Sequence, residues 1–156
     1  MKSFNIPSLV PEFQVKNFNK SVAFYQGILG FNIEYSRHES KFAMISLERA
    51  WIMLEETKDF HAVSDREFIE ERQWRTGELE SPFGRGINFQ ILVCDVDKLY
   101  AKIIKSKYPI KVPIEERWYR AENKETGVRQ FLIMDPDGYL LRLQQEIGER
   151  LSSNFP

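Results

Sequence analysis

Cysteine is nearly absent from this sequence, with Cys94 as the only one among 156 residues. A single thiol excludes an intrachain disulfide and a zinc site built from paired cysteines. Because the preceding Leu92 and Val93 are apolar, we expect Cys94 to be a buried structural thiol rather than a nucleophile. Histidine is also rare, and neither His38 nor His61 belongs to an HxxxH or HxxE pair that would bind a metal ion.

The sequence also lacks an excess of charge and long apolar runs. Lys and Arg number 22, Asp and Glu number 23, and the basic residues are spread among acidic ones, so no patch suited to nucleic acid is predicted. No run approaches the roughly 18 apolar residues of a membrane span, and the first residues lack the apolar core of a signal peptide. We therefore expect a cytoplasmic protein with no nucleic-acid or membrane partner.

Apolar residues are present in quantity, at 42% of the chain with 12 Phe, and their layout repeats at half the chain length. Residues 12–23 overlay residues 90–101 after a shift of 78 positions. The matched pairs include Val15 with Val93, Asn17 with Asp95, Lys20 with Lys98 and Ala23 with Ala101. Matched cap, apolar and lysine positions favour an internal duplication.

Each repeat predicts a strand, a helix and three further strands. In the first repeat Asn17 or Asn19 caps a helix that ends at Gly30, and in the second the cap is Asp95 or Asp97. The apolar stripes of these helices are Phe18, Val22, Tyr25 and Leu29, and Val96, Leu99, Tyr100, Ile103 and Ile104. The later strands are expected at residues 31–37, 42–47 and 51–55, and at residues 110–114, 129–134 and 139–144.

We predict a single domain over residues 1–156, with module one at about 8–56, a linker at about 57–85 and module two at about 86–146. Within the linker, Ser64-Asp65-Arg66-Glu67 has the form of a capping box and predicts a short helix. Trp74 in the same segment is expected to serve packing or dimer contact rather than ligand binding.

Several short motifs occur in a specific order. They are Ser21-Val22-Ala23-Phe24-Tyr25, Ile28-Leu29-Gly30-Phe31, Gly84-Arg85-Gly86-Ile87-Asn88, Asp95-Val96-Asp97 and Asp135-Pro136-Asp137-Gly138-Tyr139-Leu140-Leu141-Arg142. Over roughly residues 8 to 150 this order resembles the vicinal-oxygen-chelate superfamily of glyoxalases, dioxygenases and bleomycin-resistance proteins, and the bleomycin-resistance-like branch in particular. The resemblance implies an α+β fold in which two βαβββ modules form curled mixed sheets around a shared concavity.

Side-chain alternation predicts which residues face that concavity. The apolar residues expected to pack under the helices are Phe13, Val15, Phe89, Ile91 and Val93. Those expected on the concave side are Val10, Glu12, Gln14, Asn88, Gln90 and Leu92. A face that combines amides and a carboxylate with apolar residues suits a ligand cavity, although a partly solvated sheet face that binds nothing has the same pattern.

Metal-dependent members of the superfamily take their ligands from the first and last strands of the modules. The resemblance places those positions at Val10, Met53, Asn88 and Arg142. Valine has no donor atom, a thioether is a poor ligand for Zn²⁺, Mn²⁺ or Fe²⁺, and arginine carries a permanent positive charge. We therefore expect neither a metal nor another cofactor.

The candidate ligand-binding residues are Glu12, Trp51, Asn88, Gln90, Trp118, Tyr119 and Arg142. The resemblance implies that the aromatic stretch at Trp118 and Tyr119, ahead of the strand at 129–134, contributes to a ligand groove, often across a dimer interface. Trp51 and Trp118 are equally compatible with packing in the core. Arg142 needs an anionic ligand or a carboxylate partner, for which Glu12 and Glu55 are candidates. Such a pair would lower the pKa of Glu12, the wrong direction for a general base, so no residue is predicted to be catalytic.

These residues favour a metal-independent protein that binds and sequesters a small molecule, planar aromatic or anionic, as a homodimer. Antibiotic or xenobiotic resistance is one role that the resemblance implies. The alternative is an enzyme, a glyoxalase-like lyase or isomerase or a dioxygenase with a non-standard site. A third possibility is a dimerising scaffold with a vestigial pocket. Because one scaffold hosts many functions, the fold alone does not choose among them.

Overall fold

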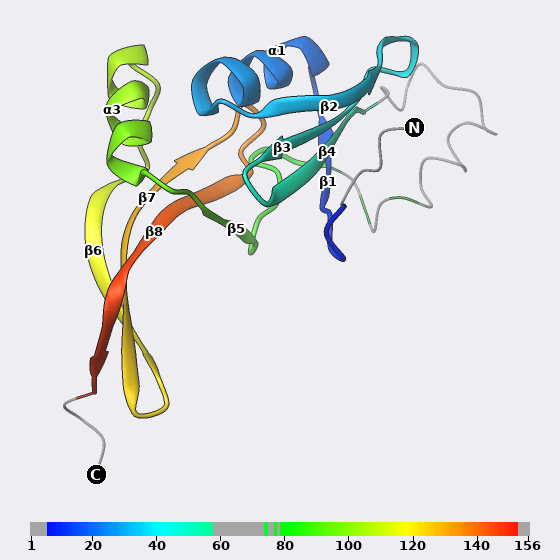
Figure 1. Cartoon of the computed structure of the whole chain (residues 1–156). Coiled ribbons are helices and arrows are strands. Elements are labelled where there is room, and N and C mark those ends of the chain that lie inside the picture. Colours follow the sequence, from blue (N-terminus) through cyan, green and yellow to red (C-terminus); the bar gives the residue numbers. More distant parts are fainter. Residues whose placement is uncertain (1–5, 58–73, 75–76, 78, 153–156) are drawn as a thin grey trace.

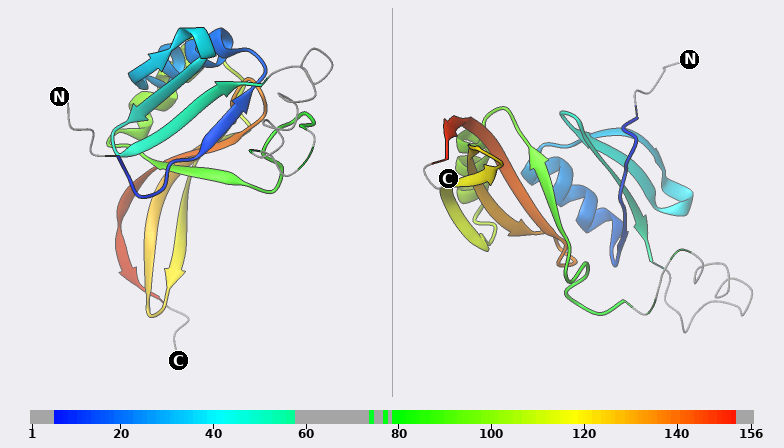
Figure 2. Two further views of the ribbon diagram at one scale, coloured as in Figure 1. Left: turned by 90° about the vertical axis from the view of Figure 1, so that its right-hand side faces the viewer. Right: turned by 90° about the horizontal axis from the view of Figure 1, so that it is seen from below.

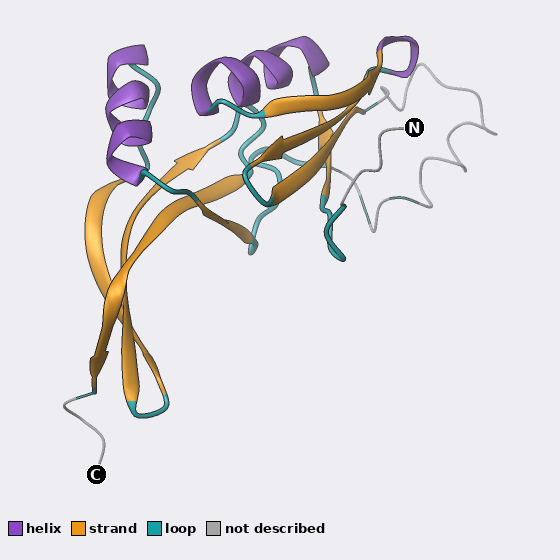
Figure 3. Cartoon of the chain, viewed as in Figure 1, coloured by secondary structure: helices purple, strands orange, loops and turns teal. Residues whose placement is uncertain are grey.

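Two four-stranded mixed sheets form the body of the protein in the computed structural model, which describes residues 6–57, 74, 77 and 79–152 (Figures 1 and 3). Sheet A has the order β1-β4-β3-β2 and sheet B the order β5-β8-β7-β6. Sheet A consists of β1 (Glu12–Val15), β2 (Asn32–Arg37), β3 (Phe42–Leu47) and β4 (Ala50–Glu56). Sheet B consists of β5 (Asn88–Leu92), β6 (Val112–Ala121), β7 (Lys124–Met134) and β8 (Leu140–Leu151). The predicted α+β class with two curled modules is confirmed.

In each module the first strand runs parallel to the last, and the remaining pairs are antiparallel. A parallel pair needs a long crossover, which the helix after the first strand begins. The helices gather along one side of the sheets (Figures 1 and 2). They are α1 (Phe18–Val22), which continues as the π-helix η1 (Ala23–Leu29), and α3 (Val96–Ser106); a 3-10 turn, η2 (His38–Ser40), connects β2 and β3.

The structure identifies the helix caps that the sequence left open. Asn17 Oδ1 accepts a hydrogen bond from the backbone N–H of Lys20, and Asp95 Oδ1 accepts one from Lys98, each at 2.9 Å. Gly30 ends η1 with a φ of 86°, which glycine adopts without steric cost. The predicted stripe of the first helix is buried at Phe18, Tyr25 and Leu29, and that of the second at Val96 and Ile103.

The two modules share one core. The residues predicted to pack under the helices are almost fully buried at Phe13, Val15, Ile91 and Val93, as alternation required. Phe13 stacks on Tyr139 with ring centroids 4.2 Å apart and also meets Phe89 at 4.5 Å. The first strands of both modules therefore bury the same aromatic cluster.

A hydrogen-bonded clasp joins the Asp-Pro-Asp-Gly turn of module two to module one. Asp135 Oδ2 accepts from the Tyr25 hydroxyl at 3.0 Å. Asp137 accepts from the Lys16 backbone N–H at 3.2 Å and from the Ser21 hydroxyl at 3.4 Å. We call Asp135, Asp137, Tyr25, Ser21 and Lys16 the intermodule clasp. Because both carboxylates are buried, these bonds fix how the modules sit against each other.

The last three strands are longer than the sequence pattern predicted. They extend beyond the body as an arm, which we define as residues 115–127 and 145–151 (Figure 1). Trp118 and Tyr119, which precede residues 129–134 as expected, lie inside β6 and pair with β7. Charged residues of the arm pair across its strands, as Arg150 does with Glu125 at 2.6 Å.

The predicted linker helix at Ser64–Glu67 lies outside the described residues. Trp74, from the same segment, is described and is 76% exposed. Among the residues that the structure describes, no helix has both the length and the apolar character needed to cross a lipid bilayer.

Candidate functional site

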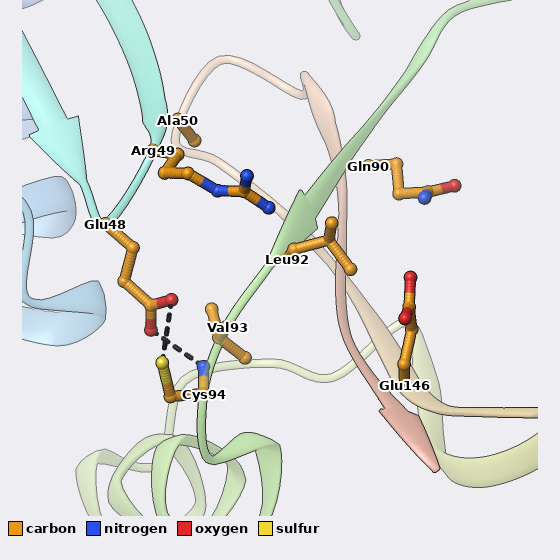
Figure 4. A pocket seen from close by; sticks show the side chains of 8 residues that line it. All are labelled: Glu48, Arg49, Ala50, Gln90, Leu92, Val93, Cys94 and Glu146. Carbon is orange, nitrogen blue, oxygen red and sulfur yellow. Dashed lines mark hydrogen bonds between the residues drawn. The ribbon is translucent and has the colours of Figure 1, made fainter. Parts of the chain in front are cut away.

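A cavity of about 480 Å³ lies between the two modules, where the turn from β3 to β4 approaches β5 and β8 (Figure 4). Its lining residues are Glu48, Arg49, Ala50, Gln90, Leu92, Val93, Cys94 and Glu146. The volume falls within the range of small-molecule pockets. Gln90 and Leu92 are two of the residues that alternation assigned to the concave side, so the concave face of sheet B forms part of this cavity.

Gln90 connects the cavity to Arg142. The Gln90 side-chain oxygen accepts a hydrogen bond from Arg142 Nη2, and the two residues are direct neighbours across β5 and β8. The Arg142 guanidinium carbon lies 6.0 Å from the centre of the Tyr119 ring. The structure therefore brings together three of the predicted site residues, Gln90, Tyr119 and Arg142.

Arg142 does not make the carboxylate pair proposed from the sequence. Glu12 lies beside β4 of its own module, where Gln14 Nε2 contacts Glu12 Oε1 at 3.4 Å and Glu55 Oε2 at 3.3 Å. Partial burial, together with hydrogen bonding to Glu55 and repulsion from it, raises the pKa of Glu12 rather than lowering it. The pair with Arg142 that would have lowered this pKa does not form, because the register of β1 against β4 places Glu55 diagonally across from Glu12 and that of β5 against β8 places Gln90 opposite Arg142.

The remaining predicted residues occupy separate places. Asn88 is exposed on the same strand face as Gln90. Trp51 is half-buried at the start of β4 and lies opposite Ser46. Trp118 alternates with Tyr119 and so points to the other face of β6, where its ring lies 4.1 Å from the Arg150 guanidinium carbon. Trp118 thus stabilises the arm, and Tyr119 is the aromatic residue that borders Arg142.

Cys94 is exposed, not buried as its apolar neighbours suggested. Its thiol donates to Glu48 Oε2 at 3.1 Å, and its backbone N–H donates to Glu48 Oε1 at 2.7 Å (Figure 4). The carboxylate raises the pKa of the thiol through this hydrogen bond and through its charge. The strand ends at Leu92, so alternation no longer determines where the next side chains point. The raised pKa disfavours the thiolate, which is the reactive form.

The four positions that the sequence resemblance implies for metal ligands do not provide a donor set that fits a divalent ion. Arg142 donates to Gln90, Asn88 offers one amide, and Val10 and Met53 offer no suitable ligand atom. Among the described residues, no group of three or more His, Cys, Asp or Glu side chains lies close enough together to hold a metal ion.

Sequence reasoning missed Gln130, a buried glutamine on the concave face of sheet B. Its Nε2 donates to Tyr119 Oη at 3.0 Å and to Glu115 Oε1 at 3.2 Å. The sequence pattern that could have identified it is its alternation with Phe131 and Ile133, which are fully buried on the side of the sheet that the helices cover. A glutamine between such residues must face the opposite side, the side on which Arg142 lies.

Comparison with known proteins gives a family and a fold. The family model described as Glyoxalase/Bleomycin resistance protein/Dioxygenase superfamily matches residues 8–143. No curated protein matches the chain.

Solved structures are also similar. The virulence protein STM3117 from Salmonella typhimurium has a TM-score of 0.62 at 14% identity, covering 94% of this chain and 100% of the other. TioX from Micromonospora sp. ML1 has a TM-score of 0.62 at 17% identity, covering 89% and 98%. A glyoxalase/bleomycin resistance protein/dioxygenase superfamily member from Vibrio splendidus 12B01 has 28% identity and a TM-score of 0.37, covering 87% and 95%.

At these identities the likeness to STM3117 and TioX concerns the fold alone, whereas the family model spans most of the sequence. The resemblance inferred from the motifs is confirmed at the level of the superfamily. With its two curled βαβββ modules, the chain belongs to the Glyoxalase/Bleomycin resistance protein/Dioxygenase superfamily.

Proposed function

We propose that this protein binds a small planar organic anion on the concave face of sheet B, without a metal ion and without converting it. Arg142 is the charged anchor, Gln90 and Tyr119 flank it, and the adjoining cavity holds the body of the ligand. Sequestration of a drug or metabolite is the role that such binding serves.

The observation that carries this proposal is the environment of Arg142. Its guanidinium is half-buried, its hydrogen bond to Gln90 reaches a neutral amide, and its Nε is buried without a hydrogen-bond partner among the described residues. A partly desolvated charge whose hydrogen bond goes to a neutral amide costs free energy that an anionic ligand would offset. A carboxylate also matches the planar guanidinium, since both can form two parallel hydrogen bonds.

The shape of the surroundings supports a planar ligand. Tyr119 is 44% exposed and offers a ring beside the Arg142 guanidinium. An aromatic face provides contact area at a small cost in side-chain entropy. The volume of about 480 Å³ next to Gln90 is sufficient for a small organic molecule.

The proposal is tested by isothermal titration calorimetry with two acids, benzoate and 2-naphthoate, and their neutral amides. We expect the acids to bind and the amides to bind at least roughly tenfold more weakly, because a charge-assisted hydrogen bond is worth about 1.5–3 kcal/mol. Arg142→Gln should remove this preference. The matched control is Arg120→Gln, which removes an exposed arginine of β6 that alternates with Tyr119. Equal binding of acids and amides, or binding that EDTA abolishes, would contradict the proposal.

An enzyme is the second candidate, and the raised pKa of Glu12 is the observation that favours it. A carboxylate with a raised pKa is a stronger base than an ordinary carboxylate and so accepts a proton from a substrate more readily. Hemithioacetals are the substrates to assay, with and without divalent ions. Turnover that Glu12→Gln abolishes would support this candidate over simple binding.

We also propose that the protein is a homodimer in which the arm contacts a second copy. Ile147 and Leu151 of the arm are 40% and 77% exposed, and the arm extends beyond the body that could otherwise cover them (Figure 1). Size-exclusion chromatography with light scattering is expected to give twice the chain mass of 18.5 kDa. Leu151→Glu combined with Ile147→Glu should shift the protein toward the monomer, and a monomeric unaltered protein would refute the proposal.

A further inference from the structure

Gln130 has a buried acceptor that nothing satisfies among the described residues. The residue is 3% exposed, and its Oε1 has no hydrogen-bond partner there. Its Nε2, by contrast, contacts both Glu115 Oε1 and Tyr119 Oη. A buried amide oxygen without a hydrogen bond is unfavourable in free energy. A bound molecule that donates a hydrogen bond to Gln130 Oε1 would remove this cost.

The orientation of the Gln130 amide is determined by Glu115. An ionised carboxylate accepts hydrogen bonds and cannot donate them. The Arg117 guanidinium, whose Nε lies 3.0 Å from Glu115 Oε1, donates a hydrogen bond to the carboxylate, lowers its pKa and so favours the ionised form. The end of the amide that contacts Glu115 must therefore be its NH2 group, because a rotated amide would place two acceptors against each other. Oε1 remains as the acceptor at the free end.

Arg142 provides the complementary unsatisfied donor. In the pairing of β7 with β8, Gln130 lies opposite Gln144 and Arg142 lies opposite Leu132, which makes Gln130 and Arg142 diagonal neighbours on one face. Tyr119 connects them, since its hydroxyl contacts Gln130 and its ring lies beside Arg142. The Gln130 amide and the Arg142 guanidinium each have one buried atom, Oε1 and Nε, without a hydrogen-bond partner among the described residues, and both side chains lie next to Tyr119.

We infer that Gln130 selects ligands that carry a hydrogen-bond donor in addition to their anionic group. The ligand class is a planar aromatic acid with an N–H or O–H substituent, whose anionic group binds Arg142 and whose substituent donates to Gln130. This inference rests on the proposed anion binding at Arg142, and it adds which anions that site prefers. Tyr119 is the most exposed of Tyr119, Arg142 and Gln130, so a shift of its side chain opens the way to Gln130 while its ring still contacts the ligand.

The test compares the dissociation constants of benzoate, the three aminobenzoate isomers and their N,N-dimethyl derivatives. The isomer whose amino group reaches Gln130 is expected to bind about tenfold more tightly than benzoate, which is the usual effect of one buried hydrogen bond. Its dimethyl derivative has lost both N–H donors and should lose this gain. In Gln130→Met the tenfold difference between the aminobenzoate and benzoate should disappear.

Gln144→Met is the matched control. Gln144 is the same residue type, is 4% exposed and lies directly opposite Gln130, and its own side chain leaves no buried atom unsatisfied. This variant should keep the preference for the aminobenzoate. If benzoate binds and no isomer binds better, or if Gln144→Met removes the preference as well, the role of Gln130 is refuted and anion binding stands. If none of the acids binds, both proposals fail.

Discussion

Replacement of Gly138 by alanine is expected to lower the free energy of unfolding by about 3 kcal/mol or more. Gly138 has a φ of +103°, and a Cβ at this position would lie 2.4 Å from Pro82 Cβ and 2.7 Å from Pro82 Cα. Both contacts are too close for carbon atoms, and the second involves backbone, which cannot rotate away. The turn that carries the intermodule clasp would have to separate from the loop that precedes β5. Thermal unfolding should show a decrease in Tm of roughly 10 °C.

Two other glycines separate the causes of this effect. Gly86 has a φ of +85°, but a Cβ added there would meet no atom of the described residues within 4 Å, so Gly86→Ala introduces backbone strain alone and should cost about 1 kcal/mol. Gly27 lies inside η1 at an ordinary φ, and a Cβ there would meet no other atom within 4 Å in the part of the chain that the structure describes, so Gly27→Ala should leave Tm unchanged or raise it slightly. A decrease for Gly138→Ala no larger than that for Gly86→Ala would show that the close approach to Pro82 is absent in solution.

Replacement of Asp135 by alanine is expected to destabilise the protein by about 4 kcal/mol, since each unsatisfied buried donor costs about 1–3 kcal/mol. Asp135 Oδ1 accepts from the backbone N–H groups of Asp137, Gly138 and Tyr139, each at 2.9 Å, and Oδ2 accepts from Tyr25. Alanine leaves all four donors without this partner in a buried turn. Denaturant unfolding of the variant measures the loss.

Asp135→Asn is the matched variant for the role of charge. Burial raises the pKa of Asp135 from 3.8 to about 6. The folded state therefore holds this proton more tightly than the unfolded state, and ionisation of Asp135 reduces stability as pH rises from about 4 to about 6. The amide retains one acceptor oxygen for the backbone donors, so Asp135→Asn should cost less than Asp135→Ala and remove this part of the pH dependence. An unchanged pH profile in Asp135→Asn would show that Asp135 does not titrate in this range.

Much of the architecture follows from local patterns in the sequence. The alternation of Phe13 and Val15 with Glu12 and Gln14 depends only on the pleat of one strand, which is why it predicted the buried face correctly. The cap at Asn17 likewise needs only residues within one helical turn. Because the sequence repeats, the same strand alternation and helix cap could be predicted for the second module.

The candidate site depended on contacts that no local pattern contains. Alternation could place Arg142 on the concave face but could not show that its neighbour is Gln90, because that depends on the register between β5 and β8. The same limitation explains why Glu12 was assigned the wrong partner, and why Gln130 was not considered. Each of these contacts joins residues from different strands.

The sequence by itself determined the two βαβββ modules, the faces of their first strands and the residues under the helices, because strand and helix periodicity act over a few neighbouring residues. Only the tertiary structure decided the partner of Arg142, the exposure of Cys94, the length of the arm and the unsatisfied acceptor of Gln130. These features depend on which strands lie side by side and in what register, and strand pairing is a property of the whole folded chain.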